Sequence, residues 1–566
     1  MRKKQKFLAV LATMATAMAG SVALAAGPAA GAGATSPKYG GVLHVVMPWG
    51  SILDDFNPLA WAGGTGTTAG GTGSLIYESL FYDNPYTNVV TGFLGTAYKW
   101  EDSNLKLVVT TRSGVQWSDG VPFSARDVAF TFNYLKKYPA LDANALWKDP
   151  LKSVAATGPN TVVFSFSSAF TPIFPQIAVQ PIVPEHIFSK VSNPTKFINP
   201  HPVGTGPFLL KSYSPFSVTY VRNPHYWMPG RPYLSGVTMT AVKSNNTAEL
   251  LLLNGNAAYT YDAITDPQRT YVAAHPSWNH YWWPSVALNL LYFNTTKAPF
   301  NDVAFRKAVA EALDPSVIAE RAYFGALAPG DETAVTAGQL KAWVPSSLGP
   351  MYYPHSTAAA LATLNAAGYK VVGGQLESPS GQVLPTFNLL IGGPGWTDYI
   401  SIAQTISEEL KAIGISTNVV QDTFATYYAN LQSGNYDMAV SWSNNNNATP
   451  YYEYYDLLSS KQSAPPGGTA STNWERFTTP AVDSALSTYA ATSDPALQKQ
   501  AMVTIEKTVL TQVPVVPLTA RPNWFDYSTR YFTGWPSEAD PYNAGEAPDA
   551  YGGGAEMLYL NVHLLK

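Results

Sequence analysis

The sequence predicts an α/β fold with more than one domain. The chain has 566 residues, of which 46% are apolar, so it is much longer than an ordinary domain of roughly 100–200 residues. Helix and strand patterns alternate along it. In the clearest stretch, residues 386–442, they follow the order β-α-β-α-β, which predicts a parallel sheet. We therefore expect two or three α/β domains.

The first 25 residues have the three parts of a signal peptide. Positions 2, 3, 4 and 6 are basic, residues 7–25 are apolar, and Ala-Leu-Ala at 23–25 is a small-x-small cleavage site. We expect cleavage near Ala25 and a flexible Ala/Gly-rich tail over residues 26–37. The chain has no cysteine, so it cannot carry a lipid at the cleavage site. The expected location is extracytoplasmic.

The charge of the chain argues against a nucleic-acid partner. The formal net charge is −4, and removal of the four basic leader residues changes it to −8. Binding to a phosphate backbone would need basic patches instead. Charged residues make up only 13% of the chain, against about 25% in typical soluble proteins. Both adaptation to acid and a secretome of low charge fit this composition.

Local signals place several elements before the central stretch. Residues 41–47 read as a strand that ends at Pro48-Trp49-Gly50, and residues 288–293 as a strand that ends at Asn294. Ser124 with Asp127 forms a capping-box pattern that opens a helix. A further helix is expected over residues 301–313. Asp314-Pro315 then supplies the N-cap and the first position of the next helix.

The stretch 386–442 predicts where a ligand could bind. It reads as strands at 386–391, 415–420 and 436–442, with helices between them that end at Gly414 and near residue 432. Ligands bind at the carboxyl ends of strands in such sheets. Trp396 and Trp442 follow strands here, and Trp49 and Asn294 follow strands elsewhere in the chain.

The sequence shows no catalytic, metal or cofactor motif. The eight histidines are scattered, and there is no His-Glu-x-x-His pair, Gly-x-Ser-x-Gly turn or phosphate-binding loop. We therefore expect no catalytic residue, no metal and no cofactor. Aromatic content stands out instead, with 15 Trp and 34 Tyr. Aromatic faces stack on sugar rings, although ordinary packing uses most such rings.

Six short motifs, in order, resemble the peptide/nickel/oligosaccharide-binding class of ABC-importer solute-binding proteins, extracellular solute-binding protein family 5. They lie between residues 40 and 314 of the chain. The motifs are Gly-Gly-Val-Leu at 40–43, Ile-Tyr-Glu-Ser-Leu at 76–80, the segment 115–128 around Trp-Ser-Asp-Gly-Val-Pro-Phe, Val-Gly-Thr-Gly-Pro-Phe at 203–208, Arg-Asn-Pro-His-Tyr-Trp at 222–227, and the segment 294–314.

The resemblance implies a periplasmic-binding-protein-like fold with two lobes, a hinge and an inserted domain. The first lobe would comprise residues 38–81, 203–302 and 515–566, the inserted domain residues 82–202, and the second lobe residues 303–514. The hinge would lie near residues 294–301 and 514–520. The implied partners are a small oligomeric ligand and the permease subunits of an ABC transporter, and the protein would be a monomer.

The segment 437–447 bears on the class of ligand. Peptide binders of the family typically have an acidic residue there that meets the ammonium group of the peptide, whereas this chain has Asn445. A buried ammonium group without a counter-charge is costly. Residues 448–455 and 534–542 also resemble aromatic runs of the family's cello- and manno-oligosaccharide binders. We therefore expect an oligosaccharide ligand. An oligopeptide or dipeptide ligand and a secreted glycoside hydrolase are the alternatives.

The expected ligand-binding residues combine these arguments. They are Trp49, Trp61, Asn294, Trp396, Trp442, Asn445, Tyr451 and Trp535.

Overall fold

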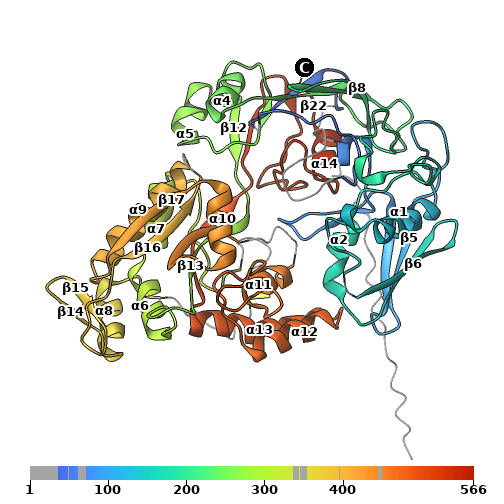
Figure 1. Cartoon of the computed structure of the whole chain (residues 1–566). Coiled ribbons are helices and arrows are strands. Elements are labelled where there is room, and N and C mark those ends of the chain that lie inside the picture. The colour runs from blue at the N-terminus through green and yellow to red at the C-terminus, as the bar shows by residue number, and fades with distance from the viewer. Residues whose placement is uncertain are drawn as a thin grey trace, which may run out of the picture.

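The chain forms two lobes and an inserted domain, each organised around its own sheet (Figure 1). The computed structural model describes residues 36–48, 50–60, 72–148, 150–335, 343–344, 353–393, 396–443 and 449–565. Helices and strands are mixed throughout, so the predicted α/β class is confirmed.

The first lobe contains a mixed sheet of seven strands. Strand β1 lies parallel to its neighbours β10 and β11, and the other pairs are antiparallel. Helices α4 (Asn245–Leu253), α5 (Pro267–Thr270) and α14 (Gly554–Asn561) belong to this lobe. The strand order is β12 (Asn279–Trp282), β20 (Phe525–Ser528), β11 (Tyr259–Thr260), β1 (Val42–Met47), β10 (Gly236–Ala241), β9 (Ser217–Arg222) and β8 (Phe208–Ser214).

The inserted domain contains an antiparallel sheet of four strands. Its order is β4 (Gly95–Glu101), β5 (Lys106–Thr111), β7 (Thr161–Phe166) and β6 (Leu151–Gly158). Helix α1 (Ala125–Lys137) packs on this sheet, and the short helices α2 (Phe174–Ala178) and α3 (Glu185–Phe188) follow. One continuous cluster of buried apolar residues joins this domain to the sheet of the first lobe. The two parts therefore share a core.

The second lobe contains a five-stranded sheet with helices on both faces (Figure 1). The order is β17 (Thr417–Asp422), β16 (Phe387–Gly392), β18 (Met438–Trp442), β13 (Ser285–Phe293) and β19 (Val515–Pro522). One face carries α6 (Val303–Ala312), α7 (Pro315–Tyr323), α8 (Thr357–Ala366) and α9 (Thr397–Lys411). The other carries α10 (Phe424–Ser433), α11 (Tyr451–Leu458), α12 (Pro480–Ala490) and α13 (Pro495–Gln512).

Three small strand pairs complete the described β-strands. They are β2 (Phe81–Asp83) with β3 (Val90–Gly92), β14 (Lys370–Val372) with β15 (Gln375–Glu377), and β21 (Phe532–Thr533) with β22 (His563–Leu564).

The chain passes between the lobes at two adjacent places. Strand β12 of the first lobe leads into β13 of the second through Trp283 and Pro284, and β19 leads back into β20 through Asn523 and Trp524. The backbone N–H of Asn523 donates to the carbonyl of Pro284 at 3.0 Å. Because β13 and β19 lie in the sheet of the second lobe, we correct the predicted lobe boundaries at 302 and 515. The predicted hinge segments, 294–301 and 514–520, are corrected to the two crossings, at residues 283–284 and 523–524.

The local sequence signals are confirmed. Ser124 and Asp127 form the predicted capping box at the start of α1. Asp314 caps α7, with Pro315 at its first position. Strands β16, β17 and β18 are parallel, as the β-α-β-α-β pattern predicts.

Several carboxyl groups are fully buried. The side chains of Glu78, Glu475, Glu506, Asp526 and Glu556 are 0% exposed, and none takes part in an ion pair with another described residue. The hydroxyl of Tyr226 lies within hydrogen-bond distance of a carboxyl oxygen of Glu78 and of one of Glu556, at 3.0 and 2.9 Å. Because burial disfavours the ionised form, it raises the pKa of both carboxyls, and the nearby Glu78 charge raises that of Glu556 further.

Burial raises the pKa of other carboxyls into the neutral range. That of Glu506 rises to about 8. The pKa rises to about 7 for Asp83, Asp262, Asp456, Glu546 and Asp549. A pKa that is higher in the folded chain than in the unfolded chain stabilises the fold at low pH. This stabilisation is fully present below the ordinary carboxyl pKa of about 4 and is lost as the pH rises through 7 to 8.

We predict that the free energy of unfolding falls as the pH rises from about 5 to about 8. Each unit by which folding raises a pKa corresponds to at most about 1.4 kcal/mol. Glu506→Leu should reduce the fall, because it removes a buried group that ionises in this range. Urea unfolding at several pH values measures the effect, with the exposed Glu320→Leu as control. Identical pH profiles for the parent and Glu506→Leu would contradict the prediction.

Candidate ligand-binding site

The carboxyl edge of the five-stranded sheet faces the first lobe. Strands β16, β17, β18 and β19 all end at this edge, and β13 begins there. Helices α9 and α10 begin directly after β16 and β17. Their amino-terminal N–H groups therefore lie at the same edge, where they favour polar or anionic groups.

Three aromatic side chains form a cluster at this edge. The ring centroids of Trp396 and Trp442 are 6.1 Å apart. Phe424 lies 6.1 Å from Trp396 and 6.2 Å from Trp442, with its ring nearly parallel to that of Trp442 at 8°. Phe424 is 49% exposed. The cluster therefore presents an apolar ring surface to the space beside the first lobe.

A buried polar network lies next to the cluster, on the α7/α9 face of the sheet. Asn289 donates to the hydroxyls of Tyr323 and Thr519 at 2.9 and 3.0 Å, and accepts from the hydroxyl of Tyr399 at 3.1 Å. Tyr323 in turn donates to a carboxylate oxygen of Asp398 at 3.0 Å. The network fixes the side chains at the start of α9, because each hydroxyl already has a partner.

A cavity of about 170 Å³ lies between the lobes, beside the network. The first lobe contributes residues 263–267, Trp283 and Trp524, and the second lobe residues 321–324, Thr397, Asp398 and Ser401. Burial raises the pKa of Asp398, although the hydrogen bond from Tyr323 opposes the shift. Trp283 and Trp524 pack edge to face with ring centroids 4.7 Å apart. The cavity therefore adjoins the chain crossings, and its shape depends on how the lobes are oriented.

Of the predicted ligand-binding residues, Trp396 and Trp442 come together at this edge. Trp49, Trp61 and Asn445 lie outside the described residues.

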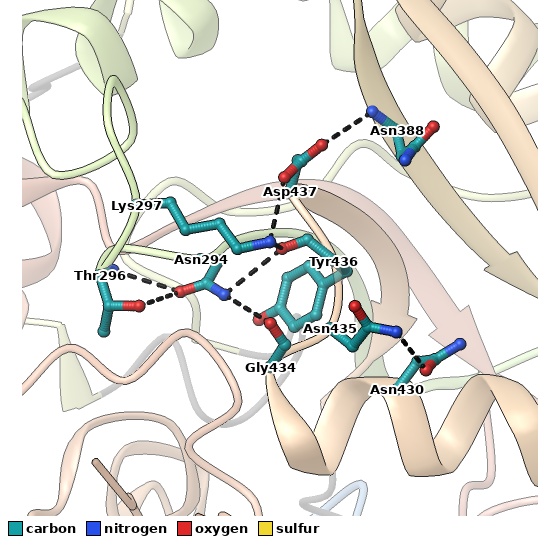
Figure 2. Close-up of polar contacts among 9 residues, drawn as sticks. All are labelled: Asn294, Thr296, Lys297, Asn388, Asn430, Gly434, Asn435, Tyr436 and Asp437. Carbon is teal, nitrogen blue, oxygen red and sulfur yellow. Dashed lines mark hydrogen bonds and ion pairs between the residues drawn. The ribbon is translucent and has the colours of Figure 1, made fainter. Parts of the chain in front are cut away.

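Asn294 lies at the opposite edge of the sheet. Because β13 runs antiparallel to β18, Asn289 pairs with Trp442, whereas the N–H of Asn294 bonds to Asp437. Five residues of strand separate these levels, roughly 17 Å. Figure 2 shows the Asn294 side chain bonded to the carbonyls of Gly434 and Tyr436 at 2.8 and 3.3 Å. The structure therefore places Asn294 away from the aromatic cluster, where it connects the end of β13 to the start of β18.

Tyr451 and Trp535 are buried. Tyr451 is 3% exposed and packs against Phe170 and Tyr489. Trp535 is 8% exposed, packs against Tyr527 and donates its indole N–H to the carbonyl of Phe532. Both rings are therefore packed in this arrangement of the lobes, and the contact of Tyr451 with Phe170 joins the second lobe to the inserted domain.

Three further side chains at this edge are not among the expected ligand-binding residues. They are Phe424, Asp398 and Arg521, whose guanidinium carbon lies 5.7 Å from the ring centroid of Trp442. Phe424 could have been found, because it follows a predicted strand in the same way as Trp396 and Trp442 do. Asp398 and Arg521 carry no local signal of this kind, since their positions depend on how α9 and β19 pack.

Away from the chain crossings, the inserted domain and the second lobe are in contact at a second place. Asn104 in the β4–β5 turn donates to the carbonyl of Ala491 at 3.2 Å and accepts from the hydroxyl of Ser493 at 3.0 Å. Thr171 donates to the carbonyl of Thr492 at 2.9 Å. These contacts join the inserted domain to the loop between α12 and α13 (Figure 1). We call them the mouth contact.

Residues 89–465, more than half of the chain, match the sequence profile of the bacterial extracellular solute-binding proteins, family 5 (middle). The chain belongs to this family. Family 5 solute-binding proteins are extracytoplasmic. Within the described residues, no helix is both long and apolar enough to cross a membrane. Among the same residues there is no group of three or more His, Asp or Glu side chains arranged to hold a metal ion.

Similar proteins agree with this membership. Protein XP55 of Streptomyces lividans is 27% identical over 512 residues, which is 87% of each chain.

Two structures of the periplasmic oligopeptide-binding protein of Thermotoga maritima share the fold. One matches with a TM-score of 0.83 and 24% identity, and covers 92% of this chain and 99% of that one. The other, with mannohexaose bound, matches with a TM-score of 0.75 and 23% identity over 93% and 98%. The oligopeptide-binding protein AppA of Bacillus subtilis, in complex with a nonapeptide, has a TM-score of 0.69 and 22% identity over 94% and 100%.

We predict that weakening the mouth contact opens this family 5 protein. Asn104→Ala with Thr171→Val should increase the mean radius of gyration, because each neutral hydrogen bond stabilises the contact by about 1 kcal/mol. Small-angle scattering of the unliganded protein measures the change. Ser378→Ala, on a hairpin of the second lobe, is the matched control. An unchanged radius of gyration in the double variant would show that the contact does not hold the lobes together.

Proposed function

We propose that this chain is the solute-binding component of an ABC importer that captures an oligosaccharide of the cello- or manno- type. The ligand would bind between the lobes at the carboxyl edge of the five-stranded sheet and reach the permease unchanged. The aromatic cluster of Trp396, Phe424 and Trp442 carries this proposal. Membership of family 5 supports the transport role.

The geometry of the cluster suits a sugar. The C–H faces of pyranose rings are apolar, and aromatic rings offer them a large flat contact surface. Phe424 is half-exposed and shares its orientation with Trp442. Thr397, Ser401 and Asp398 line the adjoining cavity and can bond to hydroxyl groups. The mannohexaose complex of the Thermotoga protein gives independent support for this ligand class.

An oligopeptide is the second candidate. Asp398 lines the cavity between the lobes, and a carboxylate there could meet the ammonium group of a peptide. The nonapeptide complex of AppA supports this alternative. Against it, Asn445 occupies the position where an acidic residue would be expected.

Closure of the lobes would couple binding to transport. A ligand that touches both lobes binds the closed form more tightly, and this difference in affinity shifts the equilibrium. Two adjacent chain crossings allow rotation with little change in the packing inside each lobe. We propose that residues 1–25 are removed on export, that the mature protein acts as an extracytoplasmic monomer, and that permease subunits recognise its closed form.

We predict that gluco- or manno-oligosaccharides raise the melting temperature, whereas di- to pentapeptides do not. A ligand that binds only the folded state stabilises it by about 2.7 kcal/mol at a concentration of 100 Kd. Thermal unfolding with each ligand measures this effect. Chromatography of the recovered sugar checks whether the protein hydrolyses it. Stabilisation by peptides alone would favour the second candidate, and shortened sugars would favour a glycoside hydrolase.

We predict that Trp396→Ala weakens oligosaccharide binding by about 1–3 kcal/mol, because it removes a stacking surface. Trp278→Ala, which removes a partly buried ring of the first lobe that stacks on His275, is the control. Trp442 is less suitable, since it packs against both core clusters of the second lobe and its loss would also lower stability. Titration calorimetry measures binding, and equal affinities for Trp396→Ala and the parent would assign Trp396 to packing alone.

A further inference from the structure

Arg521 lies at the carboxyl edge of the five-stranded sheet, beside the aromatic cluster, and forms no ion pair with a described residue. It is the seventh residue of β19, just before the chain crosses into the first lobe. Its guanidinium carbon lies 5.7 Å from the ring centroid of Trp442. Among the described residues, no ion pair and no side-chain hydrogen bond engages this guanidinium. A partly buried guanidinium has five N–H donors to satisfy, so this site has unused binding capacity.

The polar groups around Arg521 are committed elsewhere. Asp398, Tyr323 and Tyr399 of the second lobe and Tyr261 of the first lobe lie within electrostatic reach of its charge. Each tyrosine hydroxyl already donates a hydrogen bond to another residue. Tyr323 donates to Asp398, Tyr399 to Asn289, and Tyr261 to Asn523. Asp398 accepts from Tyr323 and is not within ion-pair distance of Arg521. None of these groups therefore neutralises Arg521 directly.

The segments outside the described residues offer little counter-charge. They contain a single acidic residue, Asp149. Asp149 follows Lys148 and precedes β6 of the inserted domain. The segments that immediately follow β16 and β18, residues 394–395 and 444–448, contain no Asp or Glu.

We propose that Arg521 receives a carboxylate of the ligand, so that the captured oligomer is acidic. This inference rests on the proposed role as an interlobe solute-binding protein, and it changes the expected ligand from a neutral oligosaccharide to an acidic oligomer. Arg binds carboxylates through two parallel N–H···O bonds. Trp442 would stack beside the bound group and exclude water from it. Because Arg521 lies on the crossing strand, with Tyr261 of the first lobe nearby, the carboxylate would sit where both lobes can close on it.

Two kinds of oligomer supply this chemistry: a sugar oligomer that contains a uronic acid, and a peptide with a free C-terminal carboxylate. The test uses four probes in two matched pairs. One pair is an oligouronide and its methyl ester, and the other is a pentapeptide and its C-terminal amide. Each probe is titrated by calorimetry against the parent, Arg521→Gln and Arg530→Gln. Arg530 is a suitable control because it lies over the Trp278 and Tyr531 rings, away from the cleft edge.

We expect one free acid to bind the parent about 10- to 100-fold more tightly than its neutral partner, the range given by a charge-assisted hydrogen-bond pair. Arg521→Gln should abolish this preference, and Arg530→Gln should retain it. Melting temperatures establish that the variants fold. The pair that shows the preference identifies the ligand as sugar or peptide.

Equal binding of acid and neutral probes, unchanged by Arg521→Gln, would overturn the inference and leave the proposed function standing. Failure of all four probes and of the neutral oligosaccharides to bind would overturn both.

Discussion

The antiparallel pairing of β13 with β19 is the constraint on which the rest of this structure depends. These strands are the two through which the chain passes between the lobes, and they lie side by side in one sheet. The crossings are therefore adjacent and are joined by the hydrogen bond from Asn523 to Pro284. The indole of Trp283 is fixed by Asp526 of the first lobe at 3.1 Å. The chain therefore connects the lobes only through this short double segment, and beside it one buried apolar cluster contains residues of α4 in the first lobe and of α6 to α9 in the second.

The same strand pair also forms part of the carboxyl edge of the five-stranded sheet, where the ligand is proposed to bind. Strand β19 ends at the same edge as β16, β17 and β18. Thr519 lies at the level of Trp442, since both pair with Asn289, and Arg521 lies two residues further toward the first lobe. The buried network around Asn289 connects β13, β19, α7 and α9 in one set of hydrogen bonds. A site held by such a network needs little reorganisation when a ligand arrives, and this limits the entropic cost of binding.

The buried carboxyls relate the pH dependence of the protein's stability to its low fraction of charged residues. Most of the protein's strongly buried acids have neutral hydrogen-bond partners or apolar surroundings, not cations. Such groups fit a low-dielectric core when they are protonated and destabilise it when they are ionised. The low fraction of charged residues is consistent with a chain that functions where carboxyls carry less charge. Asp398 lines the cavity between the lobes, and burial raises its pKa in the same way.

Local patterns in the sequence determined the elements. The capping box at Ser124, the Asp314-Pro315 start and the β-α-β-α-β stretch each depend on residues a few positions apart, and Trp396 and Trp442 were predicted at the ligand edge because each follows a strand of that stretch. The family resemblance then supplied the two-lobe plan. Only the tertiary structure decided the direction of β13, which places Asn294 at the far edge, and the burial of Tyr451 and Trp535. It also decided the position of Arg521, which no motif marks. The physical reason is that strand direction and burial depend on pairing and packing between segments far apart in the chain, which periodicity and spacing do not encode.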